Sequence, residues 1–350
     1  MSTGHVVTVL GELQPAELGV VLPHEHLFLR LDNWFVPPQT EEERVFASSA
    51  LSLDNLTSVR YRPYRNWDNI RIEDFDTVLA EVTAYRRAGG GTIVDVTPPA
   101  IGRDPVRARM LSERTGVHVV SGCGYYVQTS HPPQVSTMSA EDIEQELVGE
   151  LEGEIVGTGV RAGVIGEIGT SHPITADERK VLLASAAAQR RTGAPVAIHL
   201  SSGADYGHEV LDILEKGGAD LAKVALCHLD GRHPIDVAAH LELAARGAFV
   251  EYDLFGITEF SEDGLWPPPP FDLERIDAAA AIWEAGYGDR LLLSHDVCTK
   301  MQQSAYGGFG FAHLPGHVAP VMRSNGLSQN QIDALLRDNP ARWLIWEPRT

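Results

Sequence analysis

The 350-residue sequence predicts an α/β protein that folds as a single (β/α)8 barrel, or TIM barrel, over residues 1–350. Three observations lead to this prediction: eight short apolar runs, helical patterns after most of them, and a length that suits one barrel domain. The runs lack strict alternation of apolar and polar residues, which is typical of parallel strands buried on both faces. They cover residues 19–22, 92–96, 117–122, 162–168, 195–200, 224–229, 248–253 and 291–295.

Helices are predicted between these runs and after the last one. Residues 73–87 carry apolar side chains at nearly helical spacing and stop at a run of glycines. Residues 175–192 begin with Thr175 and Glu178, which form the pattern of a capping box. An open, doubly wound sheet is the alternative fold, but no glycine-rich nucleotide loop follows the first run. The other predicted helices cover residues 206–216, 234–246, 271–285 and 328–337.

Three segments lie outside this alternation. Residues 6–10 and 19–22 are expected to pair as a short N-terminal β-hairpin ahead of the barrel. Residues 32–70 are too long for an ordinary barrel connection, and we interpret them as an insertion after the first strand that forms a lid or a pocket wall. A second long loop, residues 256–270, follows the seventh run and ends in four prolines.

The composition limits the classes of function. A formal net charge of −20 argues against binding to nucleic acids or to an anionic membrane. No apolar stretch approaches the roughly 18 residues of a membrane span, and the N-terminus lacks the basic and apolar segments of a signal peptide. The cysteines, Cys123, Cys227 and Cys298, are too few and too widely spaced for a disulfide framework. We expect a cytoplasmic protein that acts on a small molecule, and we expect a homodimer.

Potential metal ligands follow five of the eight runs. In a (β/α)8 barrel, the C-terminal ends of the strands surround the active site. His24 and His26 have the i, i+2 spacing that turns two imidazoles to the same side of a strand. Imidazole and carboxylate ligands suit Zn, Mn, Fe, Co or Ni, and six ligands exceed what one catalytic zinc uses. The sequence therefore indicates two divalent metal ions, held by His24, His26, Glu167, His199, His228 and Asp296.

These residues and their surroundings resemble the phosphotriesterase family of the amidohydrolase superfamily. The resemblance extends over nearly the whole chain and rests on LPHEHL, GVIGEIGTS, the strand-end His199 and His228, SHD, and the terminal Asn339-Pro340 followed by Trp343. The segments SGCGYYV, EYDLFG and SHDVCTK, with YGG downstream, match the phosphotriesterase-related branch most closely. That branch includes the resiniferatoxin-binding proteins and an animal enzyme that acts on N-acetyltaurine.

The resemblance implies a division of the ligands between two ions. The residue that bridges the ions is a carbamylated lysine in the true phosphotriesterases, but the first lysine of this chain is Lys180. Glu167 is therefore the suitable bridge, which fits the related branch. Zinc is the first expectation, with Mn, Co, Fe or Ni as alternatives. By position, His24, His26 and Asp296 would hold the buried ion, and His199 and His228 the outer one.

The resemblance also implies a hydrolase in which a hydroxide bridging the two metals attacks a carbonyl. Asp296 is the candidate that takes the proton from the nucleophile and passes it to the leaving group. Asp230 lies two residues after His228 and either relays that proton onward or caps the following helix. The proton-relaying histidine of phosphotriesterases is replaced by Tyr252-Asp253 after the seventh strand, which argues against efficient organophosphate hydrolysis.

Substrate selection is expected from the insertion and from the loops that follow the strands. The candidates carry hydrogen-bonding or positively charged side chains, and an arginine could hold a sulfonate or carboxylate. Solvated surface charge, or simple packing, is the alternative for each. Cys227, next to His228, is expected to point away from the site because neighbouring strand residues alternate. The candidates for substrate binding are Tyr64, Arg65, Asn69, Tyr126, Arg232, Tyr252 and Lys300.

The leading hypothesis is a binuclear metal hydrolase that acts as an amidase on N-acetyltaurine or a similar N-acyl amino sulfonate or acid. The residues themselves favour the metal hydrolase, whereas only the resemblance favours the amide. A lactonase and a phosphotriesterase with low organophosphate activity are alternatives within the same class. A non-catalytic ligand-binding barrel is the alternative from another class. A missing metal ligand would mark such a barrel, and the sequence contains all six.

Overall fold

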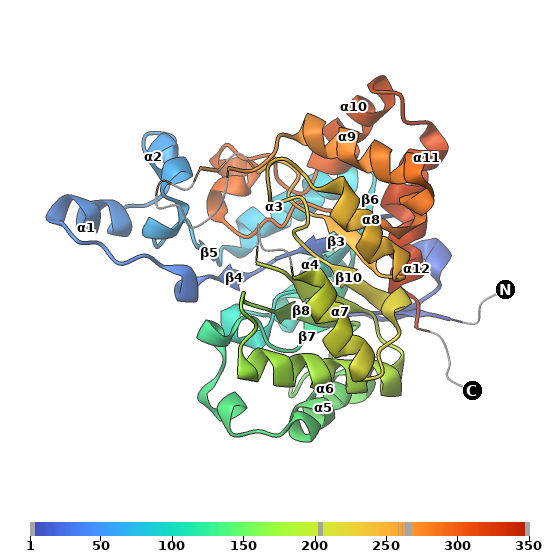
Figure 1. The fold of residues 1–350 in the computed structure, drawn as a ribbon. Helices are drawn as coiled ribbons and strands as arrows, with labels where there is room; N and C mark the ends of the chain where they lie inside the picture. The colour runs from blue at the N-terminus through green and yellow to red at the C-terminus, as the bar shows by residue number, and fades with distance from the viewer. Residues whose placement is uncertain (1–3, 202–205, 258, 261, 263–267, 347–350) are drawn as a thin grey trace.

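The computed structural model describes residues 4–201, 206–257, 259–260, 262 and 268–346. Eight parallel strands form one sheet that curls into a nearly closed barrel with helices on its outside (Figure 1). Each strand neighbours the next one along the chain, which confirms the predicted (β/α)8 architecture. The strands are β3 (Val20–Glu25), β6 (Gly90–Asp95), β7 (His118–Cys123), β8 (Val164–Gly169), β9 (Val196–His199), β10 (Val224–Leu226), β11 (Phe249–Tyr252) and β12 (Leu291–Leu293).

The outer helices agree with most of the sequence patterns. Helix α6 (Ala176–Thr192) begins with the predicted capping box, in which the Glu178 amide donates to Thr175 Oγ1 at 3.2 Å. The predicted helix 328–337 is divided between α11 (Gln329–Asp333) and the π-helix Ala334–Asp338. The helices that surround the barrel are α3 (Phe75–Arg87), α4 (Pro105–Thr115), α5 (Ala140–Val148), α6 (Ala176–Thr192), α7 (Gly207–Lys216), α8 (Val237–Ala245), α9 (Asp272–Ile282), α10 (Ala319–Ser324), α11 (Gln329–Asp333) and α12 (Asn339–Leu344).

The N-terminal hairpin exists, but the predicted pairing was wrong. Strand β1 (Val6–Thr8) pairs antiparallel with β2 (Gly11–Leu13), whereas residues 20–25 form the first barrel strand β3. The chain turns back directly after Thr8, whose hydroxyl donates to the Gly11 carbonyl at 2.8 Å. Gly11 adopts a φ of 116°, which glycine reaches without steric cost. This tight turn pairs residues 6–8 with residues 11–13. Residues 19–22 are then left to enter the barrel.

Small and branched side chains fill the inside of the barrel. Val94, Val164 and Ala197 belong to one buried cluster there, together with Phe249 and Leu292. Trp343 from α12 packs into the same cluster and is fully buried. The interior is therefore a packed core, as in other (β/α)8 barrels, and functional side chains must lie at its rim.

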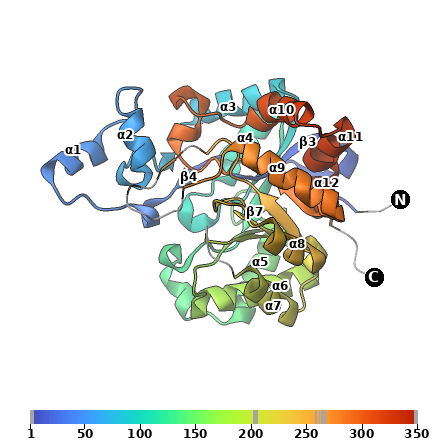
Figure 2. The same ribbon diagram turned by 45° about the horizontal axis from the view of Figure 1, so that its top comes forward.

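The segment after the first barrel strand forms an insertion that extends well away from the barrel (Figures 1 and 2). It contains α1 (Glu41–Ser48) and α2 (Leu56–Tyr61). At its base, β4 (Leu29–Arg30) pairs antiparallel with β5 (Arg71–Ile72), so both ends of the insertion leave the barrel together. The predicted insertion, residues 32–70, lies between these two short strands.

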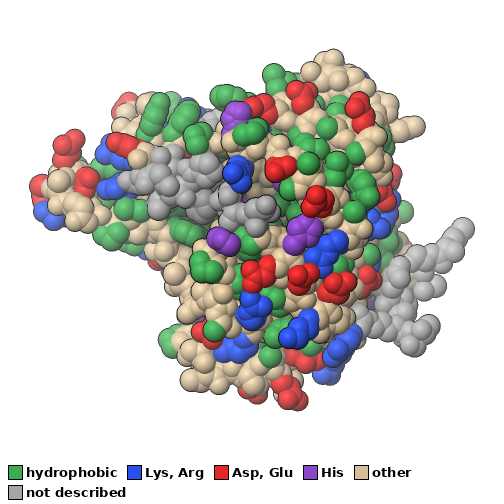
Figure 3. All heavy atoms as spheres, viewed as in Figure 1, with side chains coloured by type: hydrophobic (Ala, Val, Ile, Leu, Met, Phe, Trp, Pro, Cys, Tyr) green, Lys and Arg blue, Asp and Glu red, His purple; other side chains and the backbone are tan. Residues whose placement is uncertain are grey.

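On the face shown in Figure 3, acidic and basic side chains lie interspersed among those that the structure describes. Within the described residues, no helix is both long enough and apolar enough to cross a membrane. The free cysteines are Cys123 and Cys227, which are buried, and Cys298, which is half-buried.

The first and last barrel strands meet at a seam that side chains hold together. In the described part of the chain, no ladder of paired residues joins β3 and β12. Instead, the buried Glu25 carboxylate accepts from the amide of His295 at 3.0 Å and from the amide of Val297 at 3.0 Å. His295 Nε2 accepts from the Leu314 amide at 3.0 Å, so the proton of the ring lies on Nδ1 and is donated to Glu25 at 2.7 Å. The Glu25 carboxylate is therefore a central contact of the seam, which also contains hydrogen bonds from the His24 amide to Ser294 Oγ at 3.1 Å and from the Asp296 amide to the His24 carbonyl at 3.3 Å.

We expect Glu25→Ala to lower the free energy of unfolding of the metal-free protein by roughly 3 kcal/mol. The substitution leaves the amides of His295 and Val297 buried without an acceptor. Urea denaturation followed by tryptophan fluorescence measures this loss. Glu152→Ala, which removes an exposed carboxylate, should change stability by less than about 0.5 kcal/mol. Equal losses in the two variants would show that the seam does not depend on Glu25.

Candidate metal centre

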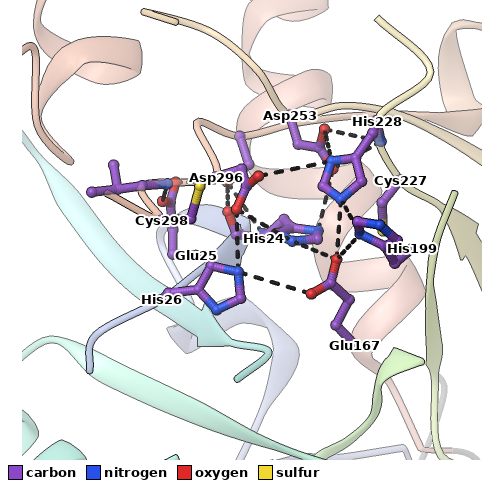
Figure 4. Close-up of polar contacts among 12 residues, drawn as sticks. His24, Glu25, His26, Glu167, His199, Cys227, His228, Asp253, Asp296 and Cys298 are labelled. Carbon is purple, nitrogen blue, oxygen red and sulfur yellow. Dashed lines mark hydrogen bonds and ion pairs between the residues drawn. The ribbon is translucent and has the colours of Figure 1, made fainter. Parts of the chain in front are cut away.

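His24 and His26 lie at the barrel mouth, as their spacing predicts, and point toward the same group of side chains (Figure 4). Their Nε2 atoms lie 3.8 and 3.1 Å from Asp296 Oδ1. These three residues offer ligand atoms that all lie within 4.8 Å of one another. The first and last strands thus supply one compact ligand set.

The tautomer of His26 is set by its neighbours. Thr97 Oγ1 donates to Asp95 Oδ1 at 2.6 Å, so its lone pair is available to accept from His26 Nδ1 at 2.8 Å. The Nδ1 atom therefore carries the proton, and the Nε2 lone pair faces the centre. This is the arrangement that a metal-ligating histidine requires, with its second nitrogen held by a hydrogen bond.

Glu167, at the end of β8, lies between the histidines of the two predicted ion sites (Figure 4). Its Oε1 is 2.7 Å from His199 Nδ1, 3.0 Å from His228 Nε2 and 3.5 Å from His24 Nε2. Its Oε2 is 3.9 Å from His26 Nε2. Burial raises the pKa of Glu167, but the charges of His199 and His24 hold it well below its usual range. The carboxylate is therefore ionised and has both groups of histidines within its reach.

Asp253 contacts one histidine of each predicted ion site, on the Nδ1 side of the ring that faces away from the centre. Its Oδ1 accepts from the His228 backbone amide at 3.0 Å and lies 3.0 Å from His228 Nδ1. Its Oδ2 lies 3.2 Å from His24 Nδ1. With Nδ1 of both rings turned toward Asp253, their Nε2 atoms face Glu167 and the centre. A fully buried carboxylate thus orients two ligands at once.

Two of the candidate ligands have left-handed backbone conformations. His228 has a φ of 61° and Asp296 a φ of 50°. Such conformations cost about 1–3 kcal/mol in non-glycine residues and concentrate at functional sites. They turn the side chains of residues that follow β10 and β12 inward over the barrel mouth.

The buried charges of the centre fit divalent cations. Burial lowers the pKa of His24, but the negative charges of Asp253 and Glu167 outweigh this and raise it to about 10. A potential that favours an imidazolium so strongly also favours a metal ion. His24 Nε2 and Asp296 Oδ1, which both face the centre, are buried without a hydrogen-bond partner among the described residues. Because unpaired buried polar atoms are rare, they indicate missing ligands, and the donor set suits two transition-metal ions.

The comparison with known families agrees with this geometry. A model of the phosphotriesterase family matches residues 4–344. The chain belongs to the phosphotriesterase family. An N-acetyltaurine hydrolase from Danio rerio is 39% identical over 346 residues, which cover 98% of this chain and 99% of that protein.

Two solved structures of the family are similar over nearly the whole chain. A resiniferatoxin-binding protein from Rhodobacter sphaeroides has a TM-score of 0.95 and 41% identity, covering 98% of this chain and 95% of that one. A phosphotriesterase homology protein from Escherichia coli, complexed with phosphate in its active site, has a TM-score of 0.76 and 29% identity. That similarity covers 94% of this chain and 99% of the other.

In this member of the phosphotriesterase family, a pocket with about 860 Å³ of empty space, including its open mouth, lies over the metal centre. Backbone bonds join the insertion to the loop after β11: the Phe260 amide donates to the Arg60 carbonyl at 2.9 Å, and the Glu262 amide to the Tyr61 carbonyl at 3.0 Å. The rings of Tyr61 and Phe260 stack at 5.0 Å. Parts of the predicted loop 256–270, namely residues 258, 261 and 263–267, lie outside the described residues. The described lining is His26, Leu31, Trp34, Pro63, Tyr64, Ile101, Tyr126, Glu167, His199, His228, Gly231, Leu254, Ile257, Glu259, Phe260, Pro269, Asp296 and Cys298.

Two of the seven predicted substrate-binding residues line this pocket, Tyr64 and Tyr126. The Tyr126 ring packs edge-on against the imidazole of His199 at 4.8 Å between centroids. Both tyrosines therefore stay candidates for contact with substrate.

The predicted cationic contacts have other partners. Arg65 pairs with Glu43 at 3.3 Å, and Lys300 pairs with Asp68 at 2.5 Å. Arg232 lines a separate cavity beside α7 and α8. None of these three side chains is among the described residues of the main pocket, so the expectation that they grip an anionic group is not met.

Asn69 and Tyr252 are structural. The Asn69 amide donates to the Pro63 carbonyl at 3.0 Å and accepts from the Met301 amide at 3.0 Å, which ties the insertion to the loop after β12. The Tyr252 hydroxyl lies 2.8 Å from His240 Nδ1 of α8, outside the barrel. The polar groups of both side chains are therefore bonded within the protein, Asn69 to backbone groups and Tyr252 to His240.

Asp230 is held away from the pocket. Its Oδ2 accepts from Arg275 Nε at 2.6 Å, and its two oxygens accept from the amides of Asp253 and Leu254 at 3.1 Å each. It does not cap the following helix, because Asp236 is the N-cap of α8. The structure gives Asp230 a positioning role for the loop after β11, and nothing in these contacts indicates a proton relay.

Cys227 is buried as predicted, but it does not point away from His228 into the outer layer. The left-handed conformation of His228 breaks the strand alternation, and Cys227 belongs to the cluster inside the barrel. Its thiol donates to Glu251 Oε2 at 3.2 Å, directly below His24. Burial, with the charge of Glu251, raises the pKa of the thiol well above its ordinary value, so it is not a nucleophile.

The sequence patterns did not single out Glu25 and Asp253 as parts of the site. Asp253 ends the seventh apolar run, just as Glu167 and His199 end theirs, so the same rule would have selected it. Glu25 lies between His24 and His26 in the sequence. Because the side chains of neighbouring strand residues point to opposite sides, Glu25 is expected to face away from the two histidines, and this is the one sequence signal for its separate role.

We expect Asp253→Asn to weaken zinc binding by about 10- to 100-fold, because the amide removes the negative charge that lies 3.0 Å from His228 Nδ1 and 3.2 Å from His24 Nδ1. Competition with a chromophoric chelator measures the affinity. Asp277→Asn makes the same change at an exposed position of α9 and should leave affinity unchanged. Unaltered zinc binding in Asp253→Asn would contradict the role of this carboxylate.

Proposed function

We propose that this protein is a binuclear metal hydrolase that cleaves the amide bond of a small N-acyl compound, with N-acetyltaurine as the first candidate substrate. The position of Glu167 between two groups of histidines carries the metal-hydrolase part of the proposal. The names of relatives support the amide, since the N-acetyltaurine hydrolase from Danio rerio matches the whole chain. Zinc is the proposed metal because histidines and carboxylates are its usual ligands, and a cytoplasmic location fits the free cysteines.

Two divalent ions, when bound, lower the pKa of water so that it becomes a nucleophile at neutral pH, and they polarise a carbonyl. His24, His26 and Asp296 would hold one ion and His199 and His228 the other, with Glu167 between them. Apolar side chains around the pocket, such as Leu254, exclude bulk water and strengthen these electrostatic effects.

Asp296 is placed to move a proton. Burial raises its pKa, but the close contact with His26 and the charge of His228 lower it to about 2, so Asp296 is ionised at neutral pH. Its carboxylate lines the pocket, and its Oδ2 can accept the proton of the attacking water. Because Asp296 is a weak base, the proton passes on to the amide nitrogen as the carbon–nitrogen bond breaks. The Tyr126 hydroxyl, whose ring packs against His199 in the pocket lining, can orient the substrate.

The substrate proposal is tested by offering the zinc-loaded protein three compounds: N-acetyltaurine, a panel of lactones and paraoxon. We expect turnover of N-acetyltaurine, followed as release of free taurine. Paraoxon should be hydrolysed slowly if at all, since Tyr252 and Asp253 stand where phosphotriesterases have their proton-relaying histidine. Rapid lactone opening without amide cleavage would replace the amidase by a lactonase.

The role of Glu167 is tested by a substitution that keeps its volume. We expect Glu167→Gln to lower kcat by at least about a hundredfold, because a neutral amide cannot balance the charge of two cations. Glu152→Gln removes an equal charge at an exposed position and should retain full activity. Comparable activity in both variants, with two zinc ions bound, would rule out Glu167 as the bridge. If the unmodified protein binds no zinc and turns over none of the three compounds, a non-catalytic ligand-binding barrel is favoured instead.

A further inference from the structure

The distribution of charge in the pocket is unexpected for an enzyme of sulfonate-bearing amides. Beyond the candidate metal ligands, Glu259 is the single charged side chain among the described residues that line the pocket. Its other described walls are apolar or carry uncharged groups, such as the hydroxyls of Tyr64 and Tyr126. A substrate with its carbonyl at the metal centre therefore meets one acid and, within the described lining, no lysine or arginine.

Glu259 is not neutralised by a neighbouring cation. Arg60 is the cation that acts on it, and the Arg60 guanidinium donates to the Gly307 carbonyl at 3.0 Å. Glu262, on the same loop, pairs instead with Arg62 at 3.5 Å and is exposed. The carboxyl group of Glu259 therefore faces the pocket without a salt bridge among the described residues.

The described surroundings give the Glu259 carboxylate only weak hydrogen-bond support. Gln302 Oε1 accepts from the amides of Cys298 and Thr299, which fixes the orientation of the Gln302 side chain. The Thr299 hydroxyl then donates to Gln302 Oε1 at 2.8 Å, closer than its 3.3 Å contact with Glu259 Oε1. Thr299 therefore donates mainly to Gln302, and its longer contact leaves the Glu259 carboxylate only weakly hydrogen-bonded.

We infer that Glu259 selects substrates by charge and disfavours amides with an anionic group relative to neutral amides of the same shape. The inference rests on the proposed function and names the substrate class of that site. Two like charges in a pocket lined by apolar side chains repel each other more strongly than in water. A neutral amide meets no such penalty and can accept or donate a hydrogen bond at Glu259.

The selection depends on pH. Burial raises the pKa of Glu259 to about 7, with the negative charge of Asp296 adding to this and Thr299 and Arg60 opposing it. Below that pH the carboxyl group is neutral and tolerates an anion; above it the carboxylate repels one. Discrimination against anionic amides should therefore grow as the pH rises from 6 to 8.

The test compares N-acetyltaurine with its methyl sulfone analogue, in which a methyl group replaces the charged oxygen of the sulfonate. The quantity measured is the ratio of the two kcat/KM values, because effects of pH on the shared chemistry cancel in that ratio. The zinc-loaded full chain is compared with Glu259→Gln and with the matched control Glu262→Gln. The control removes an equal charge from the same loop at an exposed side chain.

At pH 8 we expect Glu259→Gln to raise the relative kcat/KM for N-acetyltaurine about tenfold. Glu262→Gln should change the ratio less than about twofold, because solvent screens its charge. At pH 6 the effect of Glu259→Gln should be smaller. If both amides are cleaved and Glu259→Gln leaves the ratio unchanged at both pH values, charge selection is overturned while the amidase stands. If none of the proteins cleaves either amide, the proposed function fails, and the selection fails with it.

Discussion

The closure of the barrel between β3 and β12 is the constraint on which the metal centre depends. Its candidate ligands come from opposite ends of the sequence, His24 and His26 near the start and Asp296 near the end. Glu25 joins these ends by accepting from the backbone of His295 and Val297, which flank Asp296. The Asp296 amide also donates to the His24 carbonyl at 3.3 Å. The contacts that hold the fold together therefore set the distance between ligands, and stability and metal binding share the same few residues.

The electrostatics of the centre follow from burying acids with histidines as their partners. Within the described residues, the ion pairs of Glu167, Asp253 and Asp296 are all with histidines. Leaving several carboxylates buried without a permanent cation is costly, because charged groups lose their hydration in the interior. Bound divalent ions would offset that cost and would supply the positive charge that activates water. Above this centre, the described pocket lining adds Glu259 and no lysine or arginine, so the selectivity we infer and the metal chemistry both follow from an excess of negative charge.

Sequence patterns predicted the fold and the inner part of the site well, because both depend on local periodicity. Every predicted strand was found, and the strand-end rule alone selected the residues that surround Glu167. Helix α4 escaped notice because Val106 and Met110 are exposed on it and blur its apolar stripe. The predicted substrate contacts succeeded less often. Arg65 and Lys300 form ion pairs with acids far away in the sequence, and such pairings depend on loop geometry that no short-range pattern encodes.

The central claim is that Glu167 bridges two metal ions at the mouth of the barrel. A crystal structure of the zinc-loaded protein, with anomalous scattering recorded at the zinc edge, tests it most directly. We predict two anomalous peaks roughly 3.5–4 Å apart, as in other two-metal sites. The carboxylate of Glu167 should contact both, with His24 and His26 on one side and His199 and His228 on the other. A single peak, or two peaks of which Glu167 contacts at most one, would contradict the account.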